Sequence, residues 1–543
     1  MKKKLWALVL AGILTLVPLT TSANAQNKEE KEMDKAGYVN HITTTEKHPF
    51  LKGAGNSEKF RIPAFISLHD GTLFAAADAR YETTGDGGGL DTIVAKSDNF
   101  GETWQQSYAI QYPDSKGFAD LISTTCIDPC IVEGDDGKIY VLADMNPTGV
   151  TTKPEYISPN VGTGYIKIDG VDRLALTDDY EMVNKNPKET SYPYYLGDFV
   201  DGYAKVLSTN DHSETNWALD AWWNIYEIND GGKYAPLYQK QVDSDTKIYQ
   251  NAFYKDSVLH VYNTGYLLMA ESSDKGETWT PKVLNTQIKR EHETALLVSP
   301  GKGTLASDGT ILIPFYTFDR TEDKIIQQAS FIYSKDNGAT WQRSTDAPNG
   351  NGVEWSSESE IVEVYDGVLR MFIRNGTGKI SYIDAKWDES VNDYIWNTPV
   401  VTDVKVWSNC NITASTYSKE IDGKKAIFIA CPSGKKRTAG KVFTFLVNED
   451  NSMTPTYAYR VNRGDYAYSC MDELQDGRMG LLYEAKPGTM QYQNIAVDAL
   501  IKHEIGYETK VNITASVVGG VVLLGAVAAC IIKVCKHRKT DIK

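Results

Sequence analysis

Apolar residues along most of the chain fall into short runs separated by turn residues, which is typical of β-strands rather than of long helices. Six Asp-Gly pairs each stand directly before such a run, as in Thr72–Ala77 after the first pair. The pairs are Asp70-Gly71, Asp136-Gly137, Asp308-Gly309, Asp366-Gly367, Asp422-Gly423 and Asp476-Gly477. Asp-Gly between apolar runs is a strong hairpin-turn signal. We therefore expect an all-β chain of repeated antiparallel hairpins.

The Asp-Gly pairs recur at a nearly regular spacing. Four of the five intervals between successive pairs are 54–66 residues long, and the interval from Asp136 to Asp308 is 172 residues. A repeat of this length is close to one four-stranded blade of a β-propeller. The spacing therefore predicts a six-bladed β-propeller over residues 51–504. The long interval predicts an inserted, irregular β-rich module at about residues 145–260.

A second repeat supports the propeller. Three segments share the form Ser-x-Asp-x-Gly-x-Thr-Trp, with Asn99 in place of the Asp in the first; they are Ser97–Trp104, Ser272–Trp279 and Ser334–Trp341. The Asp side chain can accept hydrogen bonds from the turn amides, and the Gly permits a positive φ. Such Asp boxes occur in several propeller families. They are structural turns, so they indicate the fold and not the chemistry.

The beginning of the chain has the pattern of a signal peptide over residues 1–25. Lys2, Lys3 and Lys4 precede an apolar stretch, and Ala23-Asn24-Ala25 fits the small-x-small cleavage rule. A membrane-anchoring helix is the alternative interpretation of this segment. Residues 26–50, rich in Lys, Glu and Thr, are expected to form a flexible leader.

The other end has the pattern of a membrane anchor. Residues 513–532 contain no charged side chain, which is long enough for a transmembrane helix. A short stalk at 505–512 precedes them, and a basic tail at 533–543 follows. Because basic flanks stay in the cytoplasm, we expect an exported, cell-surface, single-pass protein with its body outside. The alternative is a buried helix of a soluble domain.

The amino-acid composition excludes several classes of protein. The chain of 543 residues is 41% hydrophobic and 23% charged, which excludes a disordered, collagenous or multi-span membrane protein. Its net charge is −15 although both ends are basic, so the body is more acidic still. An acidic body argues against nucleic-acid binding. The 32 Tyr and 11 Trp favour strands and carbohydrate contacts.

Cysteine and histidine usage gives no sign of a metal or cofactor. The body has five Cys, an odd and small number for an exported protein, so disulfides are not expected to be its framework. Cys126 and Cys130 lack the second pair or the His partners of a zinc site. No phosphate-binding Gly loop stands between a strand and a helix. We expect neither a metal nor a cofactor.

Residues of about 55–500 resemble the bacterial exo-sialidases (neuraminidases) of the retaining Asp-box family, notably the subgroup with a large inserted β module. Phe60-Arg61-Ile62-Pro63 matches the signature of that family at the first strand. The segment from Glu358 to Arg374 matches the one that supplies a Glu and a second Arg, and Cys431–Arg437 matches the third Arg.

The resemblance implies that Arg61, Arg374 and Arg437 bind the substrate carboxylate. A guanidinium group is always charged and binds a carboxylate bidentately, whereas an ammonium group is a point charge. For this reason Arg437 is preferred to its neighbours Lys435 and Lys436.

The resemblance also implies that Tyr468 is the nucleophile and Glu358 its base. The anomeric carbon of sialic acid already bears a carboxylate, so an anionic attacker would be repelled and a neutral phenol would not. A phenol with a pKa near 10 needs a base. Tyr466 is the rival candidate for the nucleophile.

Three further residues complete the site implied by the resemblance. Asp86, in the Gly-rich segment Thr84–Asp91, is expected to be the general acid and base. Arg80 is expected to help bind the substrate on the same face. Glu484 is expected to orient Arg61.

The resemblance thus implies an exo-α-sialidase that hydrolyses terminal α-linked sialic acid from glycoproteins, glycolipids and oligosaccharides, with retention through a tyrosyl-glycosyl intermediate. Sialylated glycoconjugates would be its partners. One alternative is an intramolecular trans-sialidase that releases an anhydro sugar; that subgroup usually has a Trp a few residues after the final Glu, where this chain has Thr489 and Met490. A non-catalytic sialic-acid-binding propeller and another Asp-box glycosidase are further alternatives.

Overall fold

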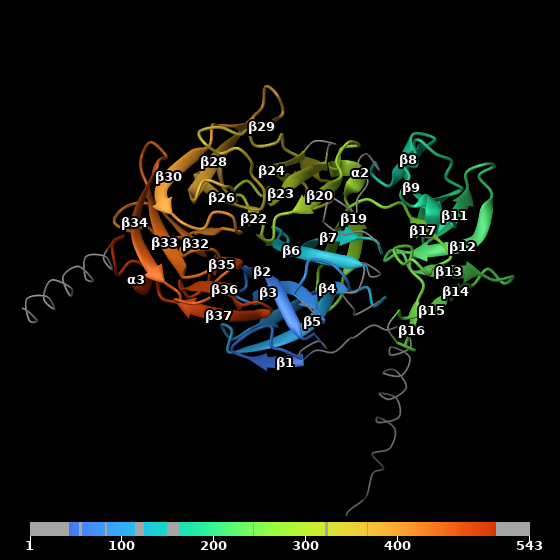
Figure 1. Cartoon of the computed structure of the whole chain (residues 1–543), viewed down its shortest axis with the longest axis horizontal. Helices are drawn as coiled ribbons and strands as arrows, with labels where there is room; N and C mark the ends of the chain where they lie inside the picture. Colours follow the sequence, from blue (N-terminus) through green and yellow to red (C-terminus); the bar gives the residue numbers. More distant parts are fainter. Residues whose placement is uncertain are drawn as a thin grey trace, which may run out of the picture.

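The structure is a computed structural model that describes residues 43–53, 57–81, 84–114, 124–148, 162–242, 244–320, 324–365 and 367–506. These residues form strands arranged in sheets around a common centre, as in a propeller (Figure 1). Helical structure in them is limited to η4 (Tyr180–Met182), α2 (Asn285–Ile288) and α3 (Val497–Leu500). The predicted all-β class is confirmed.

The first sheet has ten strands, nine of them between residues 43 and 283 and one in a short later segment at Gly301–Lys302. Its strands are β1 (Thr43–Glu46), β2 (Lys59–Ser67), β3 (Leu73–Arg80), β4 (Leu90–Ser97), β5 (Thr103–Ile110), β6 (Thr125–Glu133), β7 (Ile139–Asn146), β18 (Tyr266–Ser272), β19 (Thr280–Val283) and β21 (Gly301–Lys302). Two antiparallel meanders, β2–β5 and β6-β7-β18-β19, share this sheet because Leu90 of β4 pairs in parallel with Thr125 of β6.

Four smaller sheets follow along the chain. The first of these four sheets contains β20 (Ala295–Val298), β22 (Thr304–Leu305), β23 (Ile311–Arg320), β24 (Ile325–Ser334) and β25 (Gln342–Arg343). The second contains β26 (Ser359–Tyr365), β27 (Val368–Ile373), β28 (Lys379–Asp388), β29 (Asp393–Trp396) and β30 (Val400–Lys405). The third sheet contains β31 (Thr413–Thr416), β32 (Ala426–Pro432), β33 (Gly440–Val447) and β34 (Met453–Arg460). The fourth contains β35 (Ser469–Glu473), β36 (Met479–Lys486) and β37 (Thr489–Ile495).

The predicted count of six separate blades is wrong for the sheets that form. In the part of the chain that the structure describes, four sheets of the propeller stand as separate blades, because the parallel pairing between β4 and β6 merges the first two expected repeats into one sheet. Asp-Gly turns mark hairpins, and hairpin signals do not report pairing between strands of successive repeats.

The last strands pack against the first and close the ring. Strands β35–β37 lie beside β2 and β3 in Figure 1, and the β2 backbone joins them where the Phe60 N–H donates to the Gly488 carbonyl at 3.1 Å. Between these sheets the Tyr492 ring lies 5.2 Å from Trp104 and 5.4 Å from Phe65. Apolar burial of this kind stabilises the closure by roughly 25 cal/mol per Å² of surface removed from water.

Between β7 and β18 the chain forms a separate group of strands. An eight-stranded sheet and a two-stranded sheet make up this group, which lies at one side of the propeller (Figure 1). Its strands are β8 (Tyr165–Ile168), β9 (Val171–Thr177), β10 (Tyr194–Val200), β11 (Tyr203–Ser208), β12 (Glu214–Asp220), β13 (Ile225–Ile228), β14 (Tyr234–Pro236), β15 (Tyr238–Lys240), β16 (Lys247–Tyr249) and β17 (His260–Val261).

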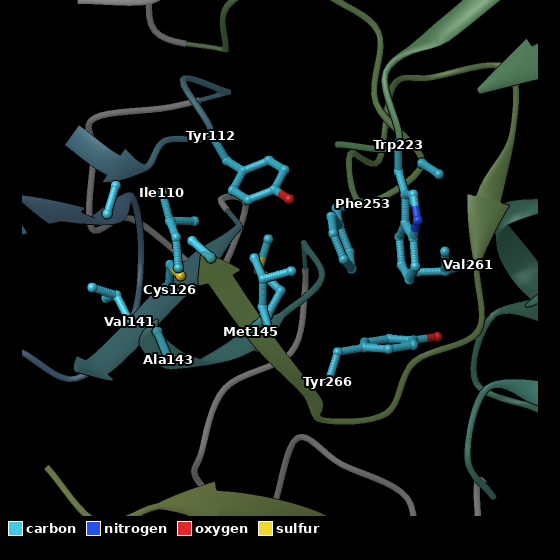
Figure 2. Packing of buried hydrophobic residues seen from close by; sticks show 14 of the residues in the cluster. Ile110, Tyr112, Cys126, Val141, Ala143, Met145, Trp223, Phe253, Val261 and Tyr266 are labelled. Carbon is cyan, nitrogen blue, oxygen red and sulfur yellow. The ribbon is translucent and has the colours of Figure 1, made fainter. Parts of the chain in front are cut away.

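Aromatic side chains join this group to the propeller. Figure 2 shows Trp223 and Phe253, which lie in connections between strands of this group, facing Tyr112 and Tyr266. The Trp223 ring lies 4.8 Å from that of Phe253 and 5.6 Å from that of Tyr266, and Tyr112 meets Phe253 edge to face at 5.4 Å. Such pairs contribute about 0.5–1.5 kcal/mol beyond their burial.

The predicted membrane attachment needs correction. No helix within residues 43–506, as far as the structure describes them, has the length and apolar character needed to cross a membrane. The predicted cell-surface anchoring is corrected on this finding. The segments predicted as signal peptide, most of the leader, most of the stalk, the membrane helix at 513–532 and the basic tail lie outside the described residues.

Candidate active site

All eight residues that were predicted as site residues lie at one end of the propeller. Arg61 lies on β2 and Arg80 at the end of β3, Asp86 in the β3–β4 loop, and Glu484 on β36. The other four stand just before or after inner strands: Glu358 before β26, Arg374 after β27, Arg437 between β32 and β33, and Tyr468 before β35. Arg61, Arg374, Arg437 and Glu484 line a pocket of about 590 Å³.

Tyr468 lies at the centre of a hydrogen-bonded group. Its hydroxyl donates to Oε1 of Glu358 at 2.7 Å and accepts from Nη1 of Arg374 at 3.0 Å. Arg374 also forms an ion pair with Glu358 at 2.6 Å. Burial and then the Glu358 charge raise the pKa of Tyr468 well above its usual value, while Arg374 opposes the shift. The phenol is therefore neutral at neutral pH and has a carboxylate placed to take its proton.

Glu484 fixes the position of Arg61. Oε1 of Glu484 accepts from Nε of Arg61 at 3.1 Å and from the backbone N–H of Ile62 at 2.9 Å. Ile62 has a φ of 60°, which is costly for a β-branched residue. Ile62 lies in β2 where the register with β3 shifts between Arg61 and Ala64. The Arg61 side chain lines the pocket, and the bond to Glu484 helps to hold it there.

Asp86 lies between two guanidinium groups. Oδ1 of Asp86 accepts from Nη1 of Arg80 at 2.7 Å and from Nη1 of Arg61 at 3.0 Å. Burial raises the pKa of Asp86, but the charges of Arg80 and Arg61 outweigh it, so the pKa lies below its usual range. Asp86 is therefore ionised at neutral pH in the free protein.

Arg437 is the most available of the three expected carboxylate-binding groups. Its guanidinium lies over the Tyr468 ring, 5.0 Å from the centroid, and it forms no ion pair with the described residues. The other two already have acidic partners, Glu484 and Asp86 for Arg61 and Glu358 for Arg374. Lys436 also lines the pocket, whereas Lys435 does not.

Tyr468 and Tyr466, the two candidate nucleophiles, differ in their contacts. The Tyr466 side chain is completely buried and its ring stacks on Tyr483, with centroids 5.0 Å apart and an interplanar angle of 23°. Its hydroxyl has no bond to Glu358, whereas that of Tyr468 has one at 2.7 Å. Of the two tyrosines, only Tyr468 is placed next to a base.

Two polar residues of the site, Asp78 and Asn409, were not predicted from the sequence. Oδ2 of Asp78 accepts from Arg80 at 2.5 Å, and burial raises the pKa of Asp78 to about 6 although Arg80 opposes the shift. Asp78 stands two positions before Arg80 on β3, so the period-2 alternation of strands would have placed both on one face. Oδ1 of Asn409 accepts from Nε and Nη2 of Arg374 at 3.1 and 2.9 Å. Nothing local in the sequence marks Asn409.

The placement of the described His, Cys, Asp and Glu side chains decides whether they can hold a metal ion. Within the described ranges, no cluster of three or more His, Cys, Asp or Glu side chains has the geometry to hold a metal ion. The five described cysteines are buried and free.

Comparisons with known proteins agree on one group of relatives. Residues 231–470 match a family model described as a BNR repeat-like domain. The chain is 30% identical over 489 residues to the "Anhydrosialidase" of Macrobdella decora (82% of this chain, 60% of that protein) and 29% identical over 472 residues to "Sialidase B" of Streptococcus pneumoniae (78% and 61%). It thus spans about three fifths of the length of each. The crystal structure of the intramolecular trans-sialidase from Ruminococcus gnavus superposes with a TM-score of 0.71 at 28% identity, covering 84% of this chain and 98% of that one.

Proposed function

Because the chain belongs to the bacterial-type sialidase family, we propose that it is an exo-α-sialidase that releases terminal α-linked sialic acid from glycoconjugates. The observation that carries this proposal is the contact of the Tyr468 hydroxyl with Glu358 at 2.7 Å, next to Arg374, which contacts both groups and lines the pocket together with Arg61 and Arg437. It pairs a neutral nucleophile with a base and with cationic groups that suit a sugar acid.

The proposed binding step uses the arginines. Arg437 receives the substrate carboxylate first, since it has no acidic partner, and Arg61 and Arg374 complete the binding. The incoming carboxylate competes with Asp86 for Arg61. Releasing Asp86 from Arg61 and adding a second negative charge both raise the pKa of Asp86, which favours the protonated form that a general acid needs.

The proposed chemistry has two displacements. In the first, the Tyr468 oxygen attacks the anomeric carbon, Glu358 takes the phenolic proton, and Asp86 gives its proton to the departing glycosidic oxygen. In the second, Asp86 takes a proton from water, the water oxygen attacks the anomeric carbon, and the Tyr468 oxygen leaves and recovers its proton from Glu358. Two inversions give net retention.

A second candidate is an intramolecular trans-sialidase, favoured by the names of two relatives, an anhydrosialidase and an intramolecular trans-sialidase. In that reaction a hydroxyl of the sugar itself takes the place of water in the second step, and an anhydro sugar is released. In this chain Thr489 begins β37, where the related subgroup usually has a Trp.

One experiment tests both candidates. The purified protein is incubated with 3′-sialyllactose and 6′-sialyllactose, and the released sugar is identified by mass spectrometry. Free sialic acid supports hydrolysis, whereas a product lighter by one water supports the intramolecular reaction. Absence of any released sugar, with the protein folded, contradicts both.

A further inference from the structure

Two lysines at the rim of the pocket take no part in the proposed chemistry. Lys436 and Lys486 both line the pocket and both are exposed. Within the described part of the chain, neither ammonium group forms an ion pair. The sugar carboxylate is assigned to the more deeply buried arginines, so these two positive charges have no partner in the proposed chemistry.

The two lysines stand on one continuous wall. The Tyr466 N–H donates to the Arg437 carbonyl at 3.0 Å, and the Ala467 N–H donates to the Glu484 carbonyl at 3.2 Å. These bonds place residues 435–438, 465–468 and 484–487 side by side. This wall also holds two acidic residues that line the pocket, the exposed Asp465 and the buried Glu484, which is paired with Arg61.

This wall adjoins the side from which the leaving group departs. Asp86 protonates the glycosidic oxygen, so its loop marks that side. The turn after Lys486 packs on this loop, since a Cβ added to Gly488 would lie 3.2 Å from Cγ2 of Thr84. Arg437, next to Lys436, is close enough for its charge to lower the pKa of Asp86. Lys436 and Lys486 therefore flank the space that the leaving group occupies.

We propose that Lys436 and Lys486 form a subsite for a second anionic group, a carboxylate or a sulfate, on the leaving group. The preferred substrates are then sialosides whose leaving group is itself acidic; this inference rests on the proposed sialidase function. An ammonium group on a flexible stem suits an anion whose position varies between substrates. The acidic body repels such substrates elsewhere, and the basic rim attracts them to this mouth.

The test compares three substrates that share the same sialyl-galactoside unit. One has no further charge, one carries a sulfate on its galactose, and one is an α2,8-linked disialyl-galactoside. We measure kcat/KM and KM at 50 and 300 mM salt for the unchanged protein and for Lys436→Gln/Lys486→Gln. Lys435→Gln is the matched control, because this neighbouring lysine is exposed but does not line the pocket.

At low salt we expect at least one dianionic substrate to be favoured about 3- to 10-fold over the monoanionic one, mainly through KM. The double substitution removes this preference, high salt weakens it, and Lys435→Gln retains it. The inference is overturned if neither dianionic substrate is favoured, or if the preference survives the double substitution. Loss of turnover on all three substrates by the unchanged protein would instead overturn the proposed function, and this inference with it.

Discussion

The two ends of the inner strands both bury charged groups in cavities of similar size, yet they differ in chemistry. The candidate active site, at the start of β2 and before β35, has a volume of about 590 Å³. The cavity at the other end of these strands measures about 570 Å³ and is lined by Lys302, Asp472 and Ser415. There Nζ of Lys302 contacts Asp472 at 2.5 Å. The buried carboxyl of Glu360 lies nearby, and burial raises its pKa well above the usual range although Lys302 opposes this.

The two ends differ in whether their cationic side chains have acidic partners. At the far end the single buried cation is paired with Asp472. At the active-site end Arg437 has no acidic partner among the described residues, and its guanidinium lies 5.0 Å from the ring centroid of a neutral phenol, which is itself bonded to a carboxylate. Buried charge and cavity volume are therefore common to both ends, while a guanidinium without an acidic partner beside a neutral phenol and its bonded carboxylate is found, among the described residues, at the active-site end.

Replacing Tyr468 by Phe should have the largest effect. Because the substitution removes the proposed nucleophilic oxygen and leaves the ring, we expect kcat on a fluorogenic sialoside to fall by about 10³-fold or more with little change in thermal stability. Tyr466→Phe is the matched control and should retain kcat within about 2-fold, since its hydroxyl has no bond to Glu358. Comparable losses in both variants would remove the distinction between the two tyrosines.

Breaking the ion pair at the far end should affect stability and not catalysis. In Lys302→Met the Asp472 carboxylate loses its partner, and we expect the free energy of unfolding to fall by about 3 kcal/mol in a denaturant titration. Adding Asp472→Leu should recover part of this loss, because no charge is then left unpaired. The kcat of folded protein should be unchanged; a large fall in kcat would mean that the far end contributes to the reaction.

Arg437→Lys should weaken substrate binding. The lysine keeps the charge but loses the bidentate contact, so we expect kcat/KM to fall by about 10- to 100-fold, mostly through KM. Steady-state kinetics with the same fluorogenic sialoside measures this effect. An unchanged KM would show that Arg437 does not contact the substrate carboxylate.

The pH profile should report the contact between Asp86 and the two arginines. A general acid acts only when protonated, and Arg80 and Arg61 lower the pKa of Asp86 in the free protein, so kcat/KM should already fall as pH rises through acidic values. In the substrate complex the competing carboxylate raises this pKa, so the corresponding fall in kcat should lie at higher pH. Asp86→Asn should abolish this limb, and identical limbs for kcat and kcat/KM would contradict the competition.

Local features of the fold could be predicted from the sequence, because their contacts are local. In the second Asp box, Oδ1 of Asp274 accepts from the Thr278 N–H at 2.9 Å, only four residues away, and Gly276 has a φ of 81°. The number of separate sheets could not be predicted in the same way. It depends on a parallel pair between Leu90 and Thr125, and no turn signal encodes that contact.

The contacts of the candidate site join residues that are far apart in the sequence, so local sequence signals could not predict them either. Arg61 and Glu484 are 423 residues apart, and Tyr468 and Glu358 are 110 residues apart. Neither spacing nor periodicity joins them; motif resemblance selected them, and the closed ring of sheets brings them together. Asn409 contacts Arg374 without belonging to any motif, so only the structure reveals it.

Identifying the residue that becomes attached to the sugar tests the proposed tyrosyl intermediate most directly. A fluorinated sialosyl fluoride that slows the second displacement is incubated with the protein, which is then digested and analysed by tandem mass spectrometry. We expect one adduct of the sugar on Tyr468, absent in Tyr468→Phe and present in Tyr466→Phe. An adduct on any other residue, or turnover of the reagent by the Tyr468→Phe variant at the rate of the unchanged protein, would contradict the proposed intermediate.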